Sequence, residues 1–185
     1  MKTLGPPNSP IAIVLDFPSR ADLLTQEPLS DYAGKLFWEE AAKYGIHKHQ
    51  TFVTYLLDKP PADDDIEEFI SKRKTCPGPE WRHVNGSWTH PDVASAVERV
   101  TRQLEECQPR LVITLGAGAL WALNGTLAVL KWRGSRLSPP QWPFTIVPLL
   151  PPRTLSQAPE TRHLFQIDLA RVQAIYEGRQ QPDRK

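Results

Sequence analysis

The chain has 185 residues, of which 40% are hydrophobic and 23% are charged, and this composition is that of an ordinary globular protein. The formal net charge of +1 excludes a strongly basic molecule, so any binding to nucleic acid would need basic residues gathered on one face. No apolar stretch approaches the roughly 18 residues that span a bilayer, and residues 1–10 lack the apolar run of a secretory signal. Two cysteines, Cys76 and Cys107, exclude a disulfide framework and favour a reducing cytoplasm.

The first half of the chain is predicted to begin with a strand and a helix. Ile11–Leu15 is a short apolar run rich in β-branched residues, which is typical of a buried parallel strand. A helix is expected over residues 32–44, after a Ser–Asp capping pair and before a glycine. A second strand is expected over residues 50–57. Three aspartates predict the start of a short helix over residues 63–72, and residues 72–90 are expected to be irregular.

The second half continues the alternation. Pro91–Cys107 is predicted to be a helix, because proline suits its first turn. Residues 110–115 form the third predicted strand, and a glycine-rich turn leads from it into a helix over residues 117–123. A fourth strand over residues 144–149 and a closing helix over residues 159–176 complete the order.

Strands that alternate with helices predict an α/β fold with three layers, α/β/α, around a mostly parallel four-stranded central sheet. We expect a single domain over residues 1–178 and a polar tail over residues 179–185. Ligands of such sheets bind outside the carboxyl ends of the strands. The residues that directly follow the four strands are therefore the candidates for a functional site.

Segments at these strand ends carry a resemblance to a known family. After the first strand the chain reads Leu15-Asp16-Phe17-Pro18-Ser19, followed by Asp22, by residues 26–29 (QEPL) and by Ala33-Gly34. The third strand and its turn read LVITLGAGAL over residues 111–120, and Trp132-Arg133-Gly134 comes later. The last strand leads into VPLLPPR over residues 147–153, then Pro159, Arg162 and Asp168-Leu169.

In this order and spacing, the chain from about Pro10 to Gly178 resembles the uracil-DNA glycosylase superfamily. The resemblance is greatest to family-4-type enzymes and to versions found in phages and prophages. It implies a protein that flips a base out of DNA into a pocket. It also implies DNA as a partner, with a viral DNA polymerase or another replication protein as a further one, a monomer, and the cytoplasm of a bacterial or phage-infected cell.

Several positions where the family carries its chemistry are replaced. The resemblance places Asp16 where the family has its water-orienting acid, although an aspartate bonded to backbone amides is an equally open interpretation. Leu29 stands in place of a stacking phenylalanine, and Phe17 either stacks instead or fills the pocket. Thr54 stands in place of the asparagine that reads the base edge, and one hydroxyl lacks the paired donor and acceptor of an amide. Pro151 replaces the catalytic histidine and offers no donor, a loss that typically costs on the order of a hundred- to a thousandfold in rate.

Contacts to DNA are expected from the remaining loops. The backbone amides of Gly116, Ala117 and Gly118 could bind a phosphate at a helix start, although a close strand-to-helix turn explains these residues equally well. Arg153 and Leu155 lie where the family's loop enters the minor groove. The other candidate contacts are Ser19, the basic cluster Lys131, Arg133 and Arg136 around Trp132, the run Lys72–Lys74, and Arg82.

No cofactor is expected. Family-4 enzymes carry an iron–sulfur cluster held by four cysteines, which two cysteines cannot build. The spacing of Cys76, His83, His90 and Cys107 matches no structural zinc pattern.

Three hypotheses follow. The favoured one is a DNA-binding protein of this superfamily with weak or lost uracil excision and an accessory role in replication or repair. The second is an active glycosylase, for uracil or a modified base, that uses Asp16 to orient water. The third is a protein-interaction module without DNA binding, which uses Trp81, Trp88 and the proline-rich loops.

Overall fold

The main sheet has four parallel strands in the order β2-β1-β6-β7. The computed structural model describes residues 3–71 and 75–179. The strands are Ile11–Leu15 (β1), Thr51–Tyr55 (β2), Leu111–Leu115 (β6) and Thr145–Leu149 (β7). Nearly every residue in them is buried, because the sheet is covered on both faces and each strand is therefore apolar throughout.

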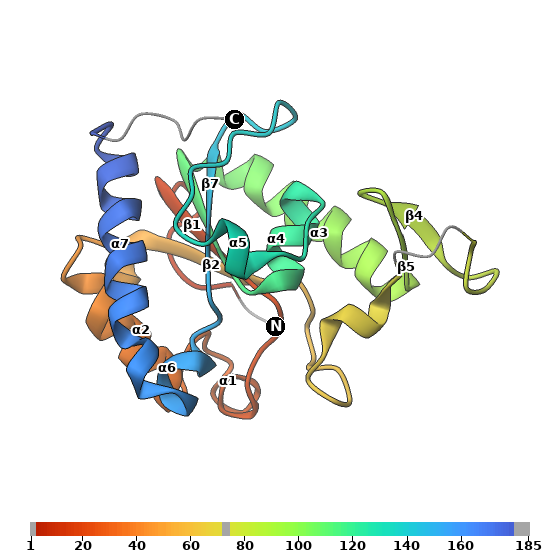
Figure 1. Cartoon of the computed structure of the whole chain (residues 1–185), viewed down its shortest axis with the longest axis horizontal. Helices are drawn as coiled ribbons and strands as arrows, with labels where there is room; N and C mark the ends of the chain where they lie inside the picture. The colour runs from red at the N-terminus through yellow and green to blue at the C-terminus, as the bar shows by residue number, and fades with distance from the viewer. Residues whose placement is uncertain (1–2, 72–74, 180–185) are drawn as a thin grey trace.

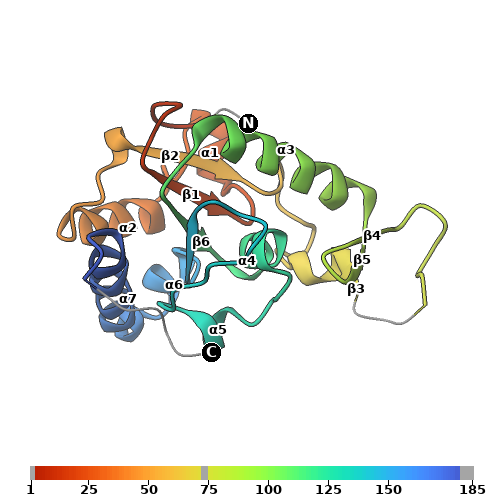
Figure 2. The ribbon, with the colours of Figure 1, turned by 90° about the horizontal axis from the view of Figure 1, so that it is seen from above.

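Helices cover both faces of this sheet (Figures 1 and 2). The α-helices are Arg20–Thr25 (α1), Tyr32–Ala42 (α2), Pro91–Cys107 (α3), Ala117–Asn124 (α4), Val129–Trp132 (α5), Arg153–Gln157 (α6) and Arg162–Tyr176 (α7). Short 3-10 turns occur at Lys48–Gln50 (η1), Ile66–Phe69 (η2) and Pro159–Thr161 (η3). Within β1, Ile11, Ile13 and Leu15 pack with α2 and α7, whereas Ala12 and Val14 pack with α3 and α4. The predicted three-layer α/β/α fold is thus confirmed.

The helix predicted over residues 63–72 is wrong. One 3-10 turn, η2, leads directly into the strand Ile70–Ser71 (β3), which joins Arg82–Val84 (β4) and Ser87–Thr89 (β5) in a second sheet. The spacing of Ile66 and Ile70 suits a helix, but Ile70 pairs with Thr89 across this antiparallel sheet.

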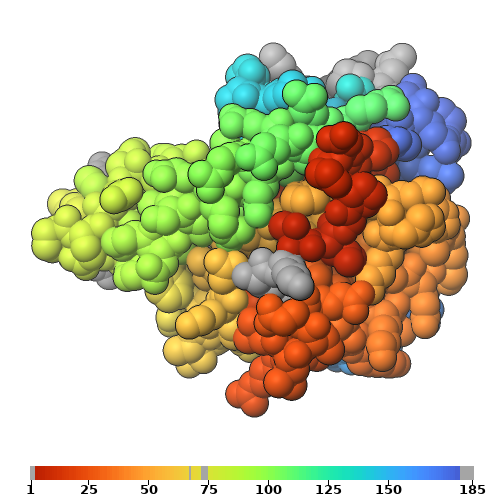
Figure 3. Space-filling view, turned by 180° about the vertical axis from the view of Figure 1, so that it is seen from behind, coloured from red at the N-terminus to blue at the C-terminus, as the bar shows by residue number. Residues whose placement is uncertain are grey.

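The segment expected to be irregular contains the β4–β5 hairpin. Asn85 and Gly86 form its turn, both with positive φ, and an Asn–Gly pair strongly favours such a turn. The hairpin stands out at one end of the molecule (Figures 1 and 3). The run Lys72–Lys74 and residues 180–185 of the predicted tail lie outside the described residues.

The neighbouring central strands β1 and β6 bring two distant segments of the chain together. Leu15 and Leu115 are paired at the carboxyl ends of these strands, so Asp16 and Gly116 emerge side by side. From β1 the chain returns to β2 on one side, and from β2 it crosses to β6 on the other. This reversal of direction is where open α/β sheets bind their ligands.

Candidate functional site

Asp16 lies against the start of α4. Its Oδ1 accepts a hydrogen bond of 2.7 Å from the backbone N–H of Ala119. Gly116 has a φ of +119°, and a Cβ on it would stand 2.2 Å from Asp16 Oδ2. A glycine is therefore required here both for the backbone conformation and for the close approach of the carboxylate. The glycine-rich turn holds the side chain of Asp16, and these amides face a carboxylate of the protein rather than an open phosphate site.

The environment of Asp16 changes its acidity. Burial raises the pKa of this carboxyl to about 6. The hydrogen bonds from the α4 backbone and the positive charge of Arg153 lower this pKa, but by less than burial raises it. Only 8% of the residue is exposed, so water stabilises the ionised form poorly. At neutral pH the carboxylate is mostly charged, and its pKa is close enough to neutrality for exchange of a proton with a bound ligand.

Asp16 opens into a cleft of about 600 Å³ at the carboxyl edge of the sheet. Residues from four segments enclose it: the start of α1, the residues before α2, the loop that contains Pro60 and Pro61, and the start of α6. Its charged lining residues are Asp16, Asp22, Asp31 and Asp64 on the acidic side and Arg20 and Arg153 on the basic side. The cleft is large enough for a nucleobase or a small nucleotide.

Phe17 and Arg153 both line this cleft and contact each other. The Arg153 guanidinium carbon lies 5.5 Å from the centre of the Phe17 ring, which is the geometry of a cation–π contact. Arg153 is exposed and Phe17 is half-buried. The pair occupies the wall of the cleft and leaves its volume open, so Phe17 does not plug the site.

Leu29 lies on the cleft wall in a strained backbone conformation. It is buried, and its φ is +56°, which a leucine rarely adopts. Its N–H donates to the hydroxyl of Tyr55, and that hydroxyl donates to Asp22 Oδ2 at 2.7 Å. Asp22 also accepts hydrogen bonds from the backbone N–H groups of Ser19 and Ser30. These buried contacts fix the cleft wall, and sequence reasoning did not find Tyr55.

Thr54 does not belong to this site. Its hydroxyl donates to Gln103 Oε1 on α3 at 2.8 Å, on the opposite face of the sheet. Tyr55, the next residue of β2, points to the cleft side instead. Because strand side chains alternate between faces, a shift of one position reverses the face. The structure therefore does not bring Thr54 together with the other residues assigned to the base pocket.

Pro151 lines the cleft as predicted, and it brings no side-chain donor. Ser19 also lines the cleft, but its hydroxyl caps α1 by accepting from the N–H of Asp22. The lining residues that can donate from a flexible side chain are Arg20, Arg153 and Gln157. These are the long side chains of the cleft lining that could stabilise negative charge there.

Two of the predicted DNA contacts are internal. Arg133 forms an ion pair of 2.5 Å with the buried Asp168 and also donates to the Leu164 carbonyl. Leu155 is only 4% exposed and packs in the core, so it cannot insert into a groove. The sequence could not show that these two residues are internal, because the residues that Arg133 and Leu155 contact lie in distant parts of the chain.

The rest of the basic cluster does not line the cleft. Lys131 is exposed and lies over the Trp132 ring at 5.2 Å, and Arg136 is half-buried. Of the predicted basic contacts that lie within the described residues, Arg153 is the one that lines the cleft.

Nothing in the described residues fits an iron–sulfur or zinc site. Cys107 is buried with its thiol on the Ser9 carbonyl, whereas Cys76 is exposed with its thiol on the Gly78 carbonyl. In residues 3–71 and 75–179, no three His, Cys, Asp or Glu side chains gather in a way that could hold a metal ion. The donor set of a four-cysteine cluster does not exist in this sequence.

The fold and the cleft define a three-layer α/β protein with an open cleft at the switch point of its sheet. The profile of the Uracil DNA glycosylase superfamily matches residues 2–173, and the chain belongs to that superfamily. This is a family of the DNA glycosylase type. A comparison with curated proteins finds no match. No helix within the described part of the chain has the length and apolar character to cross a membrane.

Proposed function

We propose that this protein binds DNA through the Asp16 cleft and excises uracil slowly or not at all. The observation that carries the proposal is the composition of the cleft: Asp16 and Arg153 are present in an open cavity, while Pro151 stands where a donor is needed. The resemblance to phage and prophage members supports an accessory role in replication or repair, beside a polymerase or another replication protein.

Binding is supported by the position of the cleft and by two arginines that stand among its four aspartates. Arg20 and Arg153 supply positive charge at two of its walls, α1 and α6. Arginine pairs well with phosphate oxygens and also stacks on flat rings. The cavity between them accommodates one extrahelical nucleotide, with Phe17 and Leu29 as apolar walls.

Weak excision is supported by what the lining lacks. Departure of uracil leaves negative charge on the base, and a positioned donor stabilises that charge in the transition state. Proline at position 151 cannot donate, and leucine at position 29 cannot stack as an aromatic ring does. These replacements preserve a space for the base while removing contacts that accelerate its release.

A second candidate function, an active glycosylase, is favoured by Arg153. Its guanidinium lies over Phe17 and acts on the charge of Asp16. A cation at this place could stabilise a departing base anion in place of the missing histidine, while Asp16 orients water. The same residues would then serve catalysis on a base whose edge suits this altered pocket.

The test of binding compares two matched arginines. Arg153 and Arg110 are both exposed and both lie over an aromatic ring, Phe17 and Tyr176 respectively. Arg110 precedes β6 and so lies at the opposite edge of the sheet. Fluorescence anisotropy with labelled single- and double-stranded DNA, over a salt series, should show at least a roughly fivefold loss of affinity in Arg153→Glu and little change in Arg110→Glu. Equal losses in both variants, or no binding by the wild type, would contradict the proposal.

A further inference from the structure

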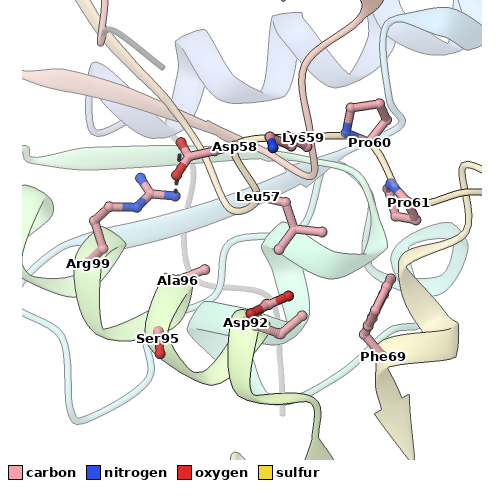
Figure 4. Close-up of a pocket in the computed structure, with 11 residues that line it drawn as sticks. Leu57, Asp58, Lys59, Pro60, Pro61, Phe69, Asp92, Ser95, Ala96 and Arg99 are labelled. Atoms are coloured by element: carbon pink, nitrogen blue, oxygen red, sulfur yellow. Dashed lines mark ion pairs between the residues drawn. The ribbon is translucent and has the colours of Figure 1, made fainter.

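A second cavity of about 460 Å³ adjoins the Asp16 cleft. It lies between the loop that follows β2 and the first turns of α3, and Figure 4 shows the side chains that line it. Pro60 and Pro61 line both this cavity and the Asp16 cleft. The two spaces are therefore neighbours, divided by a rigid proline pair.

The cavity has an apolar floor and polar groups at its ends. Leu57, Val93 and Ala96 supply apolar surface, and the Phe69 ring stands at the end near Pro61 (Figure 4). At the other end, Arg99 pairs with Asp58 at 3.7 Å and donates to the carbonyls of Tyr55 and Leu56. Arg99 is thereby fixed in place as a wall of the cavity.

The remaining polar lining residues differ in charge. Lys59 is exposed, lines this cavity and directly precedes the two prolines that divide it from the Asp16 cleft. Asp92 and Ser95 project from the start of α3, and Asp92 is exposed. A carboxylate can only accept hydrogen bonds. The cavity thus combines an aromatic ring, a cation at its entrance and an acceptor on its wall.

We infer that this second cavity binds the base of the nucleotide adjacent to the one in the Asp16 cleft, in single-stranded DNA. The base stacks on Phe69, the linking phosphate passes the Pro60–Pro61 ridge beside Lys59, and Asp92 accepts a hydrogen bond from an N–H group on the edge of the base. Stacking on aromatic rings along a basic path is a general mode of single-strand binding. Adenine, cytosine and guanine offer an amino group to this acceptor and thymine offers its ring N3–H, so the arrangement predicts binding of any base in preference to an abasic site. The inference rests on the proposed DNA binding at the Asp16 cleft.

The test measures how affinity depends on the neighbouring base. Short labelled oligonucleotides with one central uracil carry an abasic site, thymine or an amino-bearing base on its 5′ or 3′ side, and binding is followed by anisotropy. We expect one side to show tighter binding for every neighbouring base than for the abasic site, and the other side to show no such dependence. Equal affinity for all neighbours on both sides would overturn the inference.

Two matched variants separate stacking from folding. Phe69 and Trp81 both make edge contacts with His90, but Trp81 does not line the cavity. Phe69→Leu should lose roughly five- to a hundredfold in affinity for strands with a neighbouring base, and little for strands with an abasic neighbour. Trp81→Leu should leave both affinities unchanged. A loss in Phe69→Leu that is the same with and without the neighbouring base would also overturn the inference.

The outcomes distinguish this inference from the proposed function. If the wild type binds DNA and Arg153→Glu weakens binding, while the neighbouring base and Phe69 have no effect, the second cavity is not a base site and the proposed function stands. If the wild type binds no DNA, both fail.

Discussion

At the scale of single residues, the buried charge of Asp16 lowers the stability of the folded protein. Its pKa of about 6 in the folded protein lies above the ordinary 3.8, so the folded state binds this proton more tightly than the unfolded state does. The stability that protonated Asp16 contributes is therefore present below about pH 4 and is lost as the pH rises through 6. The rise of the Asp16 pKa from 3.8 to about 6 lowers the free energy of unfolding at neutral pH by on the order of 2 to 3 kcal/mol.

Replacing this carboxyl with an amide is expected to stabilise the protein. In Asp16→Asn, the amide oxygen can accept the same bond from Ala119, and no charge has to be buried. Chemical denaturation at pH 7.5 should show a free energy of unfolding about 2 kcal/mol above that of the wild type, and the gap should close near pH 4. Asp64→Asn, a change at an exposed aspartate of the same cleft, is the control and should change little. A gap that does not depend on pH would show that the charge of Asp16 is not the cause.

Three residues of the cleft could be predicted from the sequence because each comes shortly after a strand that the sequence also predicts. Asp16, Phe17 and Pro151 follow β1 and β7 directly, so the carboxyl edge of the sheet places them at the cleft. Thr54 does not reach the cleft because its hydroxyl bonds Gln103 of α3, a residue 49 positions further along the chain. The role of Tyr55 depends on a contact with Asp22, 33 residues away, which no local pattern reveals.

At the scale of elements, the buried ion pair of Arg133 and Asp168 joins the segment after α5 to α7. Asp168 is 1% exposed, and burial raises its pKa against the hydrogen bond from Arg133. Removal of the arginine would leave a buried carboxylate without its cation. This pair therefore belongs to the stability of the fold.

The expected effect of Arg133→Ala is a loss of about 3 kcal/mol in the free energy of unfolding, measured by urea denaturation. Lys131→Ala, a change at an exposed lysine two residues earlier, should stay within about 0.5 kcal/mol of the wild type. At a temperature where Arg133→Ala is folded, its affinity for DNA should match that of the wild type. If Arg133→Ala binds DNA more weakly than the wild type but is equally stable, Arg133 contacts DNA and this account of the residue is wrong.

The elements themselves were predictable to different degrees. The four central strands were found because each is apolar along its whole length, as strands covered on both faces must be. The helix over residues 63–72 failed because the pairing of Ile70 with Thr89 overrides the helical spacing of Ile66 and Ile70. The hairpin at Asn85–Gly86 carried a usable signal in its turn residues. The short helices α1, α5 and α6 have too few residues to show a period.

At the scale of the whole molecule, the reversal of chain direction between β1 and β6 creates the cleft, and the loops around it determine its chemistry. Asp16 and the start of α4 come from the two central strands, while Arg20 and Arg153 come from short helices that follow β1 and β7. The fold of the superfamily is thus kept, with a cleft that has space for a nucleotide and two arginines in its lining, but a proline where a donor is needed.

Single-turnover incubation of excess protein with labelled DNA that contains one uracil, single- or double-stranded, tests this account most directly. Abasic product is revealed by strand cleavage, and complex formation is followed in parallel on gels. We predict a salt-sensitive complex with excision that is absent, or slow and abolished in Asp16→Asn. Rapid excision of uracil would contradict the account, because the cleft would then supply the stabilisation that Pro151 cannot. Failure to form any complex would contradict it as well.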